Sequence, residues 1–214
     1  MAERPLDVIC VGRASVDLYG EQVGGLVEDM LSFAKYVGGC PANISVGTAR
    51  LGLKSALLTR VGDEAMGRFI RRQLAAEGVN VSHVKTDPER LTALVVLGIR
   101  DDHNFPLIFY RENCADMAIE ESDADPAFIA SARALLVSGT HFSTPKVEGA
   151  SRAVMAYAKA AGTKIVLDID FRPVLWGLVG HGSGSNYYVP SAAVTAKLQD
   201  IAASCDLVVG TREE

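Results

Sequence analysis

The 214-residue sequence predicts an α/β fold in which helices cover both faces of a parallel sheet. The first observation behind this prediction is that short apolar runs alternate with segments of helical periodicity. Strands that are buried on both faces of a parallel sheet have such continuous apolar sequences. The second observation is that the polar residues best suited to hold a ligand come directly after apolar runs. Because sheets of this kind bind ligands at the carboxyl ends of their strands, the two observations agree.

Apolar runs and the helical segments between them give the expected elements in order. The core strands, all expected to be buried on both faces, are residues 7–12, 55–62, 134–139, 163–169 and 206–210. The helices that follow from apolar periodicity occupy residues 66–74, 144–162 and 194–201. Gly78 and Gly162 suit the C-terminal caps of the first two helices, while Pro145 and Pro190 mark helix starts.

Two stretches interrupt the alternation. Residues 18–37 and 91–111 contain β-type runs without helices between them, and residues 100–104 are expected to form a hairpin turn. These strands fit either a separate small sheet or an antiparallel extension of the main sheet. Residues 177–188 are rich in glycine and serine, but they follow no strand directly and open no helix at their glycines. A mobile surface loop is therefore expected there, and not a phosphate-binding loop.

The Gly38-Gly39 turn leads straight into a helix that is expected to begin at Pro41. Two glycines let the backbone approach a ligand closely and take positive φ, and proline suits the first helical position. The free amide groups of a helix start favour an anionic or hydroxyl-rich ligand. Asn43 adds a side chain that both donates and accepts hydrogen bonds. A Gly-Gly turn before a helix is also common as a plain connection between a strand and a helix. The neighbouring residues therefore decide whether this turn is interpreted as a ligand site.

Composition excludes several classes of function. The net charge of −5 gives no basic surface, so neither nucleic acid nor an anionic membrane is an expected partner. The four cysteines lie far apart and the four histidines lack ligand spacing, which indicates reduced thiols and no metal cage. The N-terminal segment is too short for a signal peptide or a membrane span, so a cytoplasmic protein is expected.

The turn, its Asn43 and two acidic residues after strands, Asp17 and Asp63, together resemble the ribokinase-like (PfkB) carbohydrate kinases. The resemblance covers residues 6–214 in the family's order. It implies a three-layer α/β/α sheet with a small β-sheet lid over the sugar, the lid strands coming from residues 18–37 and 91–111. Residues 1–214 would then form one incomplete kinase domain.

The resemblance implies that Asp17, Gly38, Gly39 and Asn43 hold the sugar. An ionised carboxylate accepts two hydrogen bonds from a diol, which suits Asp17 for this role. The competing interpretation of Asp17 is a solvated carboxylate that happens to follow a strand. The sugar is expected to be an acid, because the motifs around the arginines described next resemble those of kinases for keto-deoxy sugar acids.

Arg111 and Arg172 follow expected strands and are predicted to bind the carboxylate of the sugar acid. A guanidinium matches a carboxylate geometrically and keeps its charge at any working pH. Asp170 is expected to pair with Arg172, with substrate contact as the alternative. Glu214 aligns with an Asn-x-x-Glu motif of the family that influences magnesium and phosphate, although Thr211 replaces the asparagine.

The resemblance implies ATP and Mg²⁺ as cofactors and a reaction that phosphorylates the 6-hydroxyl of 5-dehydro-2-deoxy-D-gluconate from inositol breakdown. The nearest alternative is 2-keto-3-deoxygluconate or another sugar as substrate. The family's Gly-Ala-Gly-Asp segment, which carries the catalytic base, is absent from these residues. Part of a longer kinase is therefore expected, inactive alone, with an apolar sheet edge exposed. A non-catalytic sugar-binding or dimerising piece is the alternative of another class.

Open lid strands also predict a homodimer that pairs through the lid. A dehydrogenase fits poorly, because Gly12-Arg13 after the first strand does not begin the glycine fingerprint of dinucleotide-binding folds.

Overall fold

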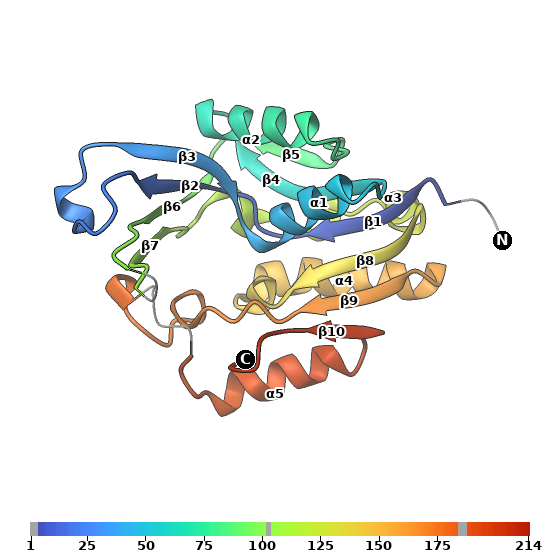
Figure 1. The fold of residues 1–214 in the computed structure, drawn as a ribbon. Helices are drawn as coiled ribbons and strands as arrows, with labels where there is room; N and C mark the ends of the chain where they lie inside the picture. Colours follow the sequence, from blue (N-terminus) through green and yellow to red (C-terminus); the bar gives the residue numbers. More distant parts are fainter. Residues whose placement is uncertain (1–3, 102–103, 184–187) are drawn as a thin grey trace.

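A central sheet and a smaller second sheet make up the protein (Figure 1). The structure is a computed structural model that describes residues 4–101, 104–183 and 188–214. Within these residues the central sheet has six strands in the order β10-β9-β8-β1-β4-β5, and every neighbouring pair is parallel. Its strands are β1 (Leu6–Val11), β4 (Ser55–Gly62), β5 (Val84–Asp87), β8 (Ala132–Ser138), β9 (Lys164–Asp168) and β10 (Leu207–Val209).

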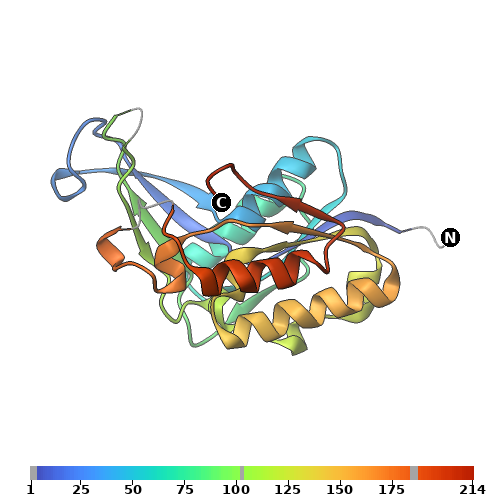
Figure 2. The ribbon, with the colours of Figure 1, turned by 90° about the horizontal axis from the view of Figure 1, so that it is seen from below.

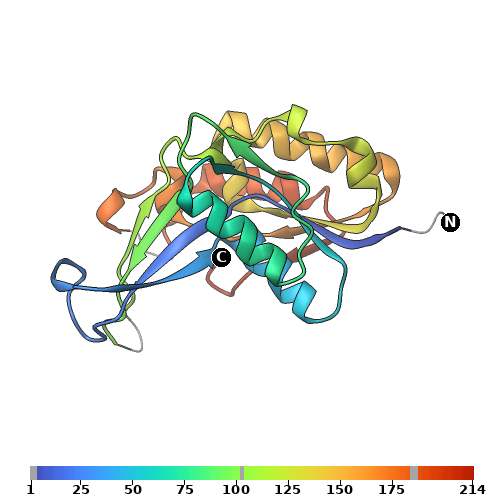
Figure 3. The ribbon, with the colours of Figure 1, turned by 90° about the horizontal axis from the view of Figure 1, so that it is seen from above.

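Helices cover both faces of the central sheet, as the alternating sequence predicts. Figures 2 and 3 show α1 (Cys40–Arg50) and α2 (Ala65–Ala76) on one face. On the other face lie α4 (Pro145–Ala161) and α5 (Ala192–Ala202), and the short α3 (Pro126–Ala130) packs against α4. The predicted α/β fold with three layers is confirmed.

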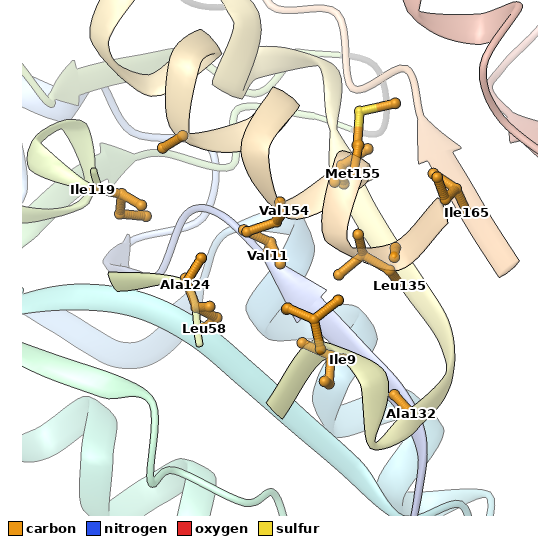
Figure 4. Close-up of a cluster of buried hydrophobic side chains, with 14 of the residues drawn as sticks. Ile9, Val11, Leu58, Ile119, Ala124, Ala132, Leu135, Val154, Met155 and Ile165 are labelled. Atoms are coloured by element: carbon orange, nitrogen blue, oxygen red, sulfur yellow. The ribbon is translucent and has the colours of Figure 1, made fainter. Parts of the chain in front are cut away.

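Burial on both faces of β1 shows why its sequence is continuously apolar. Ile9 and Val11 point to the α4 side, where they join a cluster with Leu135 and Val154 (Figure 4). The intervening Cys10 belongs to the cluster on the α1 and α2 side. Successive side chains of a strand alternate between faces, so a strand covered on both sides needs an apolar residue at every position.

The second sheet contains the strands that interrupt the alternation. It has the order β3-β2-β6-β7 and is formed by β2 (Ser15–Gly20), β3 (Phe33–Gly38), β6 (Ala93–Leu97) and β7 (Leu107–Tyr110). β2 pairs parallel with β6, and the outer pairs are antiparallel. These strands are therefore separate from the main sheet and do not extend it. That they close over a sugar, or pair with a second copy, stays a prediction.

Two strands of the central sheet and one helix differ from the prediction. β10 is not buried on both faces: Leu207 and Val209 are 55% and 48% exposed, because β10 is an edge strand with β9 as its only described neighbour. β5 was not expected, since its Val-Lys-Thr-Asp sequence buries only its end residues at the opposite edge. The short helix α3 was not predicted either, because its five residues are too few to show helical periodicity.

Two predictions fall partly on residues outside the described part of the chain. The expected hairpin turn at 100–104 includes residues 102–103, and the expected loop at 177–188 includes residues 184–187. On the flanks of the turn, the Arg100 amide donates to the Asn104 carbonyl at 3.0 Å. Across the described ranges, no helix combines the length and apolar character that a bilayer crossing requires.

Candidate functional site

The carboxyl ends of the central strands face the second sheet (Figure 1). β1 lies between β4 and β8, and the strand order runs outward from it in both directions. The point where strand order reverses is the usual ligand site of an open parallel sheet. The residues that follow β1, β8 and β9 therefore define the candidate site, together with the nearest parts of the second sheet.

The Gly38-Gly39 turn leaves space for Asp17. A Cβ atom on Gly38 would lie 2.0 Å from Asp17 Oδ1, so any side chain there would displace the carboxylate. Gly39 has a φ of 97°, and a Cβ atom there would lie 2.5 Å from the carbonyl oxygen of Arg13. The first glycine is thus needed for the position of Asp17, and the second for the conformation of the backbone.

The helix after the turn begins one residue earlier than predicted. α1 starts at Cys40 with Gly39 as its N-cap, so Pro41 is the second helical residue. Proline is tolerated there because the first turn of a helix has no acceptor for its missing N–H. The Cys40 thiol donates a hydrogen bond to Asp168 Oδ2 across the site.

Asp17 is half-buried on β2 and retains acceptor capacity. Its Oδ1 accepts a hydrogen bond from Ser15 Oγ at 3.0 Å. Burial raises the pKa of Asp17 above 3.8, while the nearby Arg13 charge and the Ser15 hydrogen bond oppose that shift. An ionised carboxylate has about four lone-pair sites, so a diol can bind beside Ser15.

Two arginines are buried at the ends of β1 and β7. Arg13 and Arg111 are 6% and 4% exposed. Arg111 Nε donates to Asp116 Oδ2 at 2.7 Å, and its Nη2 lies 2.6 Å from the same oxygen without hydrogen-bond geometry. Arg13 carries its guanidinium 5.6 Å from the centre of the Phe109 ring. Arg111 is therefore paired by the protein, whereas Arg13 rests on an aromatic face.

His141 lies beside the Arg111–Asp116 pair without contributing charge. It follows β8 and is 1% exposed, with Nε2 3.9 Å from Asp116 Oδ2. Neither ring nitrogen has a hydrogen-bond partner in the described structure. Burial, reinforced by the charge of Arg111, lowers the pKa of His141 well below 6.5. The ring is therefore neutral at physiological pH.

An open cavity of about 550 Å³ lies where β9 and β10 end. Asp170 lines it, with a φ of 37° that asparagine and aspartate tolerate better than other side chains. Its Oδ2 accepts from Ser138 Oγ at 3.1 Å, and its Oδ1 lies 3.4 Å from Arg172 Nη2. The predicted Asp170–Arg172 contact is thus present. The full lining is Cys40, Asp168, Asp170, Arg172, Thr211, Glu213 and Glu214.

Glu214 connects the segments that follow β9 and β10 by hydrogen bonds. Its Oε1 accepts from the Phe171 amide at 2.7 Å, and its Oε2 accepts from the Thr211 amide at 2.8 Å. Each carboxylate oxygen accepts one of these hydrogen bonds and has a second lone pair, and Glu214 belongs to the cavity lining. Its predicted influence on magnesium and phosphate stays a prediction.

The predicted site residues fall into groups. Asp17, Gly38 and Gly39 meet at the turn, while Asp170, Arg172 and Glu214 line the cavity. Asn43 is exposed and lines a different hollow, beside Lys35 and Phe69. Arg111 lies in the buried pair with Asp116. The sugar-binding roles predicted for these residues remain predictions.

Sequence reasoning missed three side chains of the site: Arg13, Asp116 and His141. Arg13 connects the groups, because its charge interacts with those of Asp17, Asp170 and Arg111. Its position directly after the first strand was a usable signal. Asp116 ends the run Tyr110–Asp116 that resembles the family, but no role followed from that run. For His141 no such signal existed, since its proximity to Asp116 arises only when the segments after β7 and β8 come together.

The possible metal ligands of the site are its carboxylate, histidine and cysteine side chains. Among the residues that the structure describes, no group of three or more His, Cys, Asp or Glu side chains is arranged to hold one. Mg²⁺ in phosphate-transferring enzymes is held by one or two carboxylates together with phosphates and water. The acidic cavity lining fits that arrangement and does not form a closed cage.

The fold is shared with a solved sugar-kinase structure, and the chain belongs to the PfkB family of carbohydrate kinases. The pfkB family carbohydrate kinase model matches residues 5–214. The 5-dehydro-2-deoxygluconokinase of Geobacillus kaustophilus is 39% identical over 99% of this chain, and that of Geobacillus thermodenitrificans is 37% identical over the same share.

Solved structures agree with the family. A PfkB protein from Polaromonas matches with a TM-score of 0.83 and 30% identity, over 95% of this chain and 65% of that one. A sugar kinase from Pyrococcus horikoshii in complex with ATP shares the fold with a TM-score of 0.80 and 22% identity, over 94% of this chain and 62% of that one. The chain spans 60% of the length of the two Geobacillus relatives.

Proposed function

We propose that the chain is the sugar-binding part of an ATP-dependent kinase that phosphorylates the 6-hydroxyl of 5-dehydro-2-deoxy-D-gluconate. One observation carries the proposal: the Asp17 carboxylate, on β2, lies close enough to the buried Arg13 for their charges to interact, and Arg13 interacts in turn with Arg111 and Asp170. The names of the Geobacillus relatives support the choice of substrate. Because this chain spans only part of their length, the activity is proposed for the protein to which these residues belong.

The proposed division of labour follows from charge. Asp17 accepts hydrogen bonds from sugar hydroxyls, in a position fixed by Gly38. Arg172 faces the acid from the cavity side, where Asp170 holds its guanidinium in place. Holding a reactant in one orientation supplies much of the catalysis in phosphoryl transfer.

ATP would supply the phosphoryl group, with Mg²⁺ neutralising charge on its phosphates. Glu214 would face that end of the site from the cavity lining. The sequence contains no Gly-Ala-Gly-Asp segment, so none of these residues is proposed as the catalytic base. That the 214 residues alone bind the acid without transferring phosphate stays a prediction.

Direct binding tests the substrate class. Titration calorimetry of the 214-residue chain with 5-dehydro-2-deoxy-D-gluconate, 2-keto-3-deoxygluconate and fructose should rank their affinities in that order. The two acids are expected to bind more tightly than fructose because an arginine–carboxylate pair is stronger than a neutral hydrogen bond. Tightest binding of 2-keto-3-deoxygluconate would replace the proposed substrate, and tightest binding of fructose would contradict the whole sugar-acid class.

Arg172→Ala should weaken binding of the acid by more than about tenfold, since a charge-assisted hydrogen bond contributes roughly 1.5–3 kcal/mol. Binding of the neutral C1 amide of the same acid should change far less. Calorimetry on both ligands measures the difference. Arg133→Ala is the matched control, because that side chain is 70% exposed and lies at the amino end of β8, opposite the carboxyl ends that border the site. An equal loss for acid and amide would show that Arg172 does not read the carboxylate.

The affinity for the C1 amide should fall as the pH is lowered through the pKa of Asp17. Above that pKa the ionised carboxylate accepts hydroxyl hydrogen bonds, and below it the protonated group accepts fewer. Because burial raises this pKa above 3.8, the loss should begin at a higher pH than for an exposed aspartate. Calorimetry at stepped pH values checks this. Asp17→Asn should bind weakly without the pH step, and an unchanged step in that variant would assign it to another group.

A further inference from the structure

Arg13, just after the carboxyl end of β1, has close contacts on two sides. Its main-chain carbonyl oxygen packs against Gly39, where a Cβ atom would approach to 2.5 Å. Its side chain extends toward β7, with the guanidinium carbon 5.6 Å from the centre of the Phe109 ring. Both contacts come from elements that border the candidate site, so Arg13 lies between the Gly-Gly turn and the second sheet.

The guanidinium of Arg13 makes no hydrogen bond within the described residues, and its Nε is buried without a partner. Arg111, equally buried, has Asp116 as a close carboxylate partner. Nearby carboxylates of Asp170, Asp17 and Asp116 favour the charged form of Arg13 from a distance, whereas burial and Arg111 disfavour it. A buried charge normally has direct hydrogen bonds as well.

The shape and charge of the Arg13 guanidinium indicate which ligand group would pair with it. Arginine presents its N–H groups as a planar fork that matches the two oxygens of a carboxylate. The Gly38-Gly39 turn adjoins both groups, because Gly38 lies against the Asp17 carboxylate and Gly39 against Arg13. A sugar acid held at Asp17 by its hydroxyls would therefore have its carboxylate on the Arg13 side of the turn. Arg172 has a carboxylate partner in Asp170, and Arg111 has one in Asp116. Arg111 also has two buried nitrogens, Nη1 and Nη2, without a hydrogen bond, but among the described arginines of this site only Arg13 lacks a carboxylate within 4 Å.

We propose that Arg13 binds the carboxylate of the sugar acid and thereby sets the preference of the site for acids over neutral sugars. The inference rests on the proposed function and deepens it, because it assigns the acid specificity to a residue on a core strand end. Arg172 then assists from the more exposed side, with a charge that Asp170 partly neutralises.

The test compares two ligands and three proteins by titration calorimetry of the 214-residue chain. The ligands are 5-dehydro-2-deoxy-D-gluconate and its C1 amide, which differ in charge but little in shape. The proteins are the parent chain, Arg13→Met and Arg13→Lys. Arg13→Met should weaken acid binding by more than about tenfold and amide binding by less than about twofold. Arg13→Lys should fall between, because lysine keeps the charge and loses the fork.

A structural role would give a different result. If Arg13 only supported the fold, acid and amide would lose affinity equally, and the proposal would be overturned. Unchanged acid binding in Arg13→Met would overturn it as well. Urea unfolding shows whether Arg13→Met folds; if it does not, Arg13→Lys decides, and a full acid preference in that variant contradicts the proposal. Arg133→Met is the surface control and should leave both affinities unchanged.

Failure of the proposed function is distinguishable from failure of this inference. If the parent chain binds the acid no more tightly than the amide, the sugar-acid function fails and the role of Arg13 fails with it. If the parent chain prefers the acid and Arg13→Met keeps that preference, only the role of Arg13 is wrong. The acid preference would then belong to Arg172 or Arg111.

Discussion

Asp116→Asn is expected to lower the free energy of unfolding by about 3 kcal/mol, because it leaves a buried arginine without its charge partner. Arg111 and Asp116 are 4% and 1% exposed, and Arg111 donates to Asp116 at 2.7 Å. The neutral His141 beside them offers no compensating charge. Urea unfolding followed by circular dichroism measures the change.

Two further variants make this result specific. Glu77→Gln removes one partner of the surface pair with Arg50, whose side chain is 66% exposed, and should leave the unfolding curve unchanged. The double variant Arg111→Met with Asp116→Leu removes both charges and should recover most of the lost stability. A double variant as unstable as Asp116→Asn would show that packing, and not the unpaired charge, causes the loss.

Gly38→Ala is expected to weaken binding of the sugar acid by about a hundredfold, through loss of two charge-assisted hydrogen bonds from hydroxyls to Asp17. The new Cβ atom would lie 2.0 Å from Asp17 Oδ1 and 2.1 Å from its Cγ, so the carboxylate must rotate away. The obstructed group is the end of a flexible side chain, and the φ of Gly38 is not positive. The stability of the fold should therefore change little.

Neighbouring glycines supply the controls for this experiment. Gly39→Ala meets backbone at 2.5 Å and has a φ of 97°, so it should reduce stability itself, by about 1–3 kcal/mol from the backbone strain alone. Gly47→Ala in α1 meets nothing within 4 Å and should bind normally with slightly higher stability. Calorimetry and urea unfolding on all three separate binding from folding. Normal binding by Gly38→Ala would mean that the sugar does not use Asp17.

The strand and helix pattern was predictable because it depends on local spacing. The continuous apolar run that forms β1 and the Thr144-Pro145 start of α4 are short-range signals, and both elements occur where expected. β5 and β10 show the limit of that reasoning. A strand at the edge of a sheet has neighbours on one side only, and its place in the order is a property of the whole fold.

The candidate site was predictable in its residue types and less so in its contacts. Asp17 and Gly38 lie together as the turn suggested, and Asp170 contacts Arg172. The exposed position of Asn43, in a different hollow, was not foreseen. Arg111 appeared in the sequence as a strand-end arginine, yet its partner Asp116 depends on how the chain folds back after β7.

By itself, the sequence determined the family, the order of the longer core elements and several of the residues that border the site. These follow from motifs and periodicities that lie within a few residues of one another. Only the tertiary structure decided which charged groups are paired and which are not. Arg13 and Arg111 are alike in the sequence, each following an apolar strand, but Arg111 meets Asp116 whereas Arg13 meets the face of Phe109. Burial and pairing depend on segments far apart in the chain, and the energy of a charge depends on both.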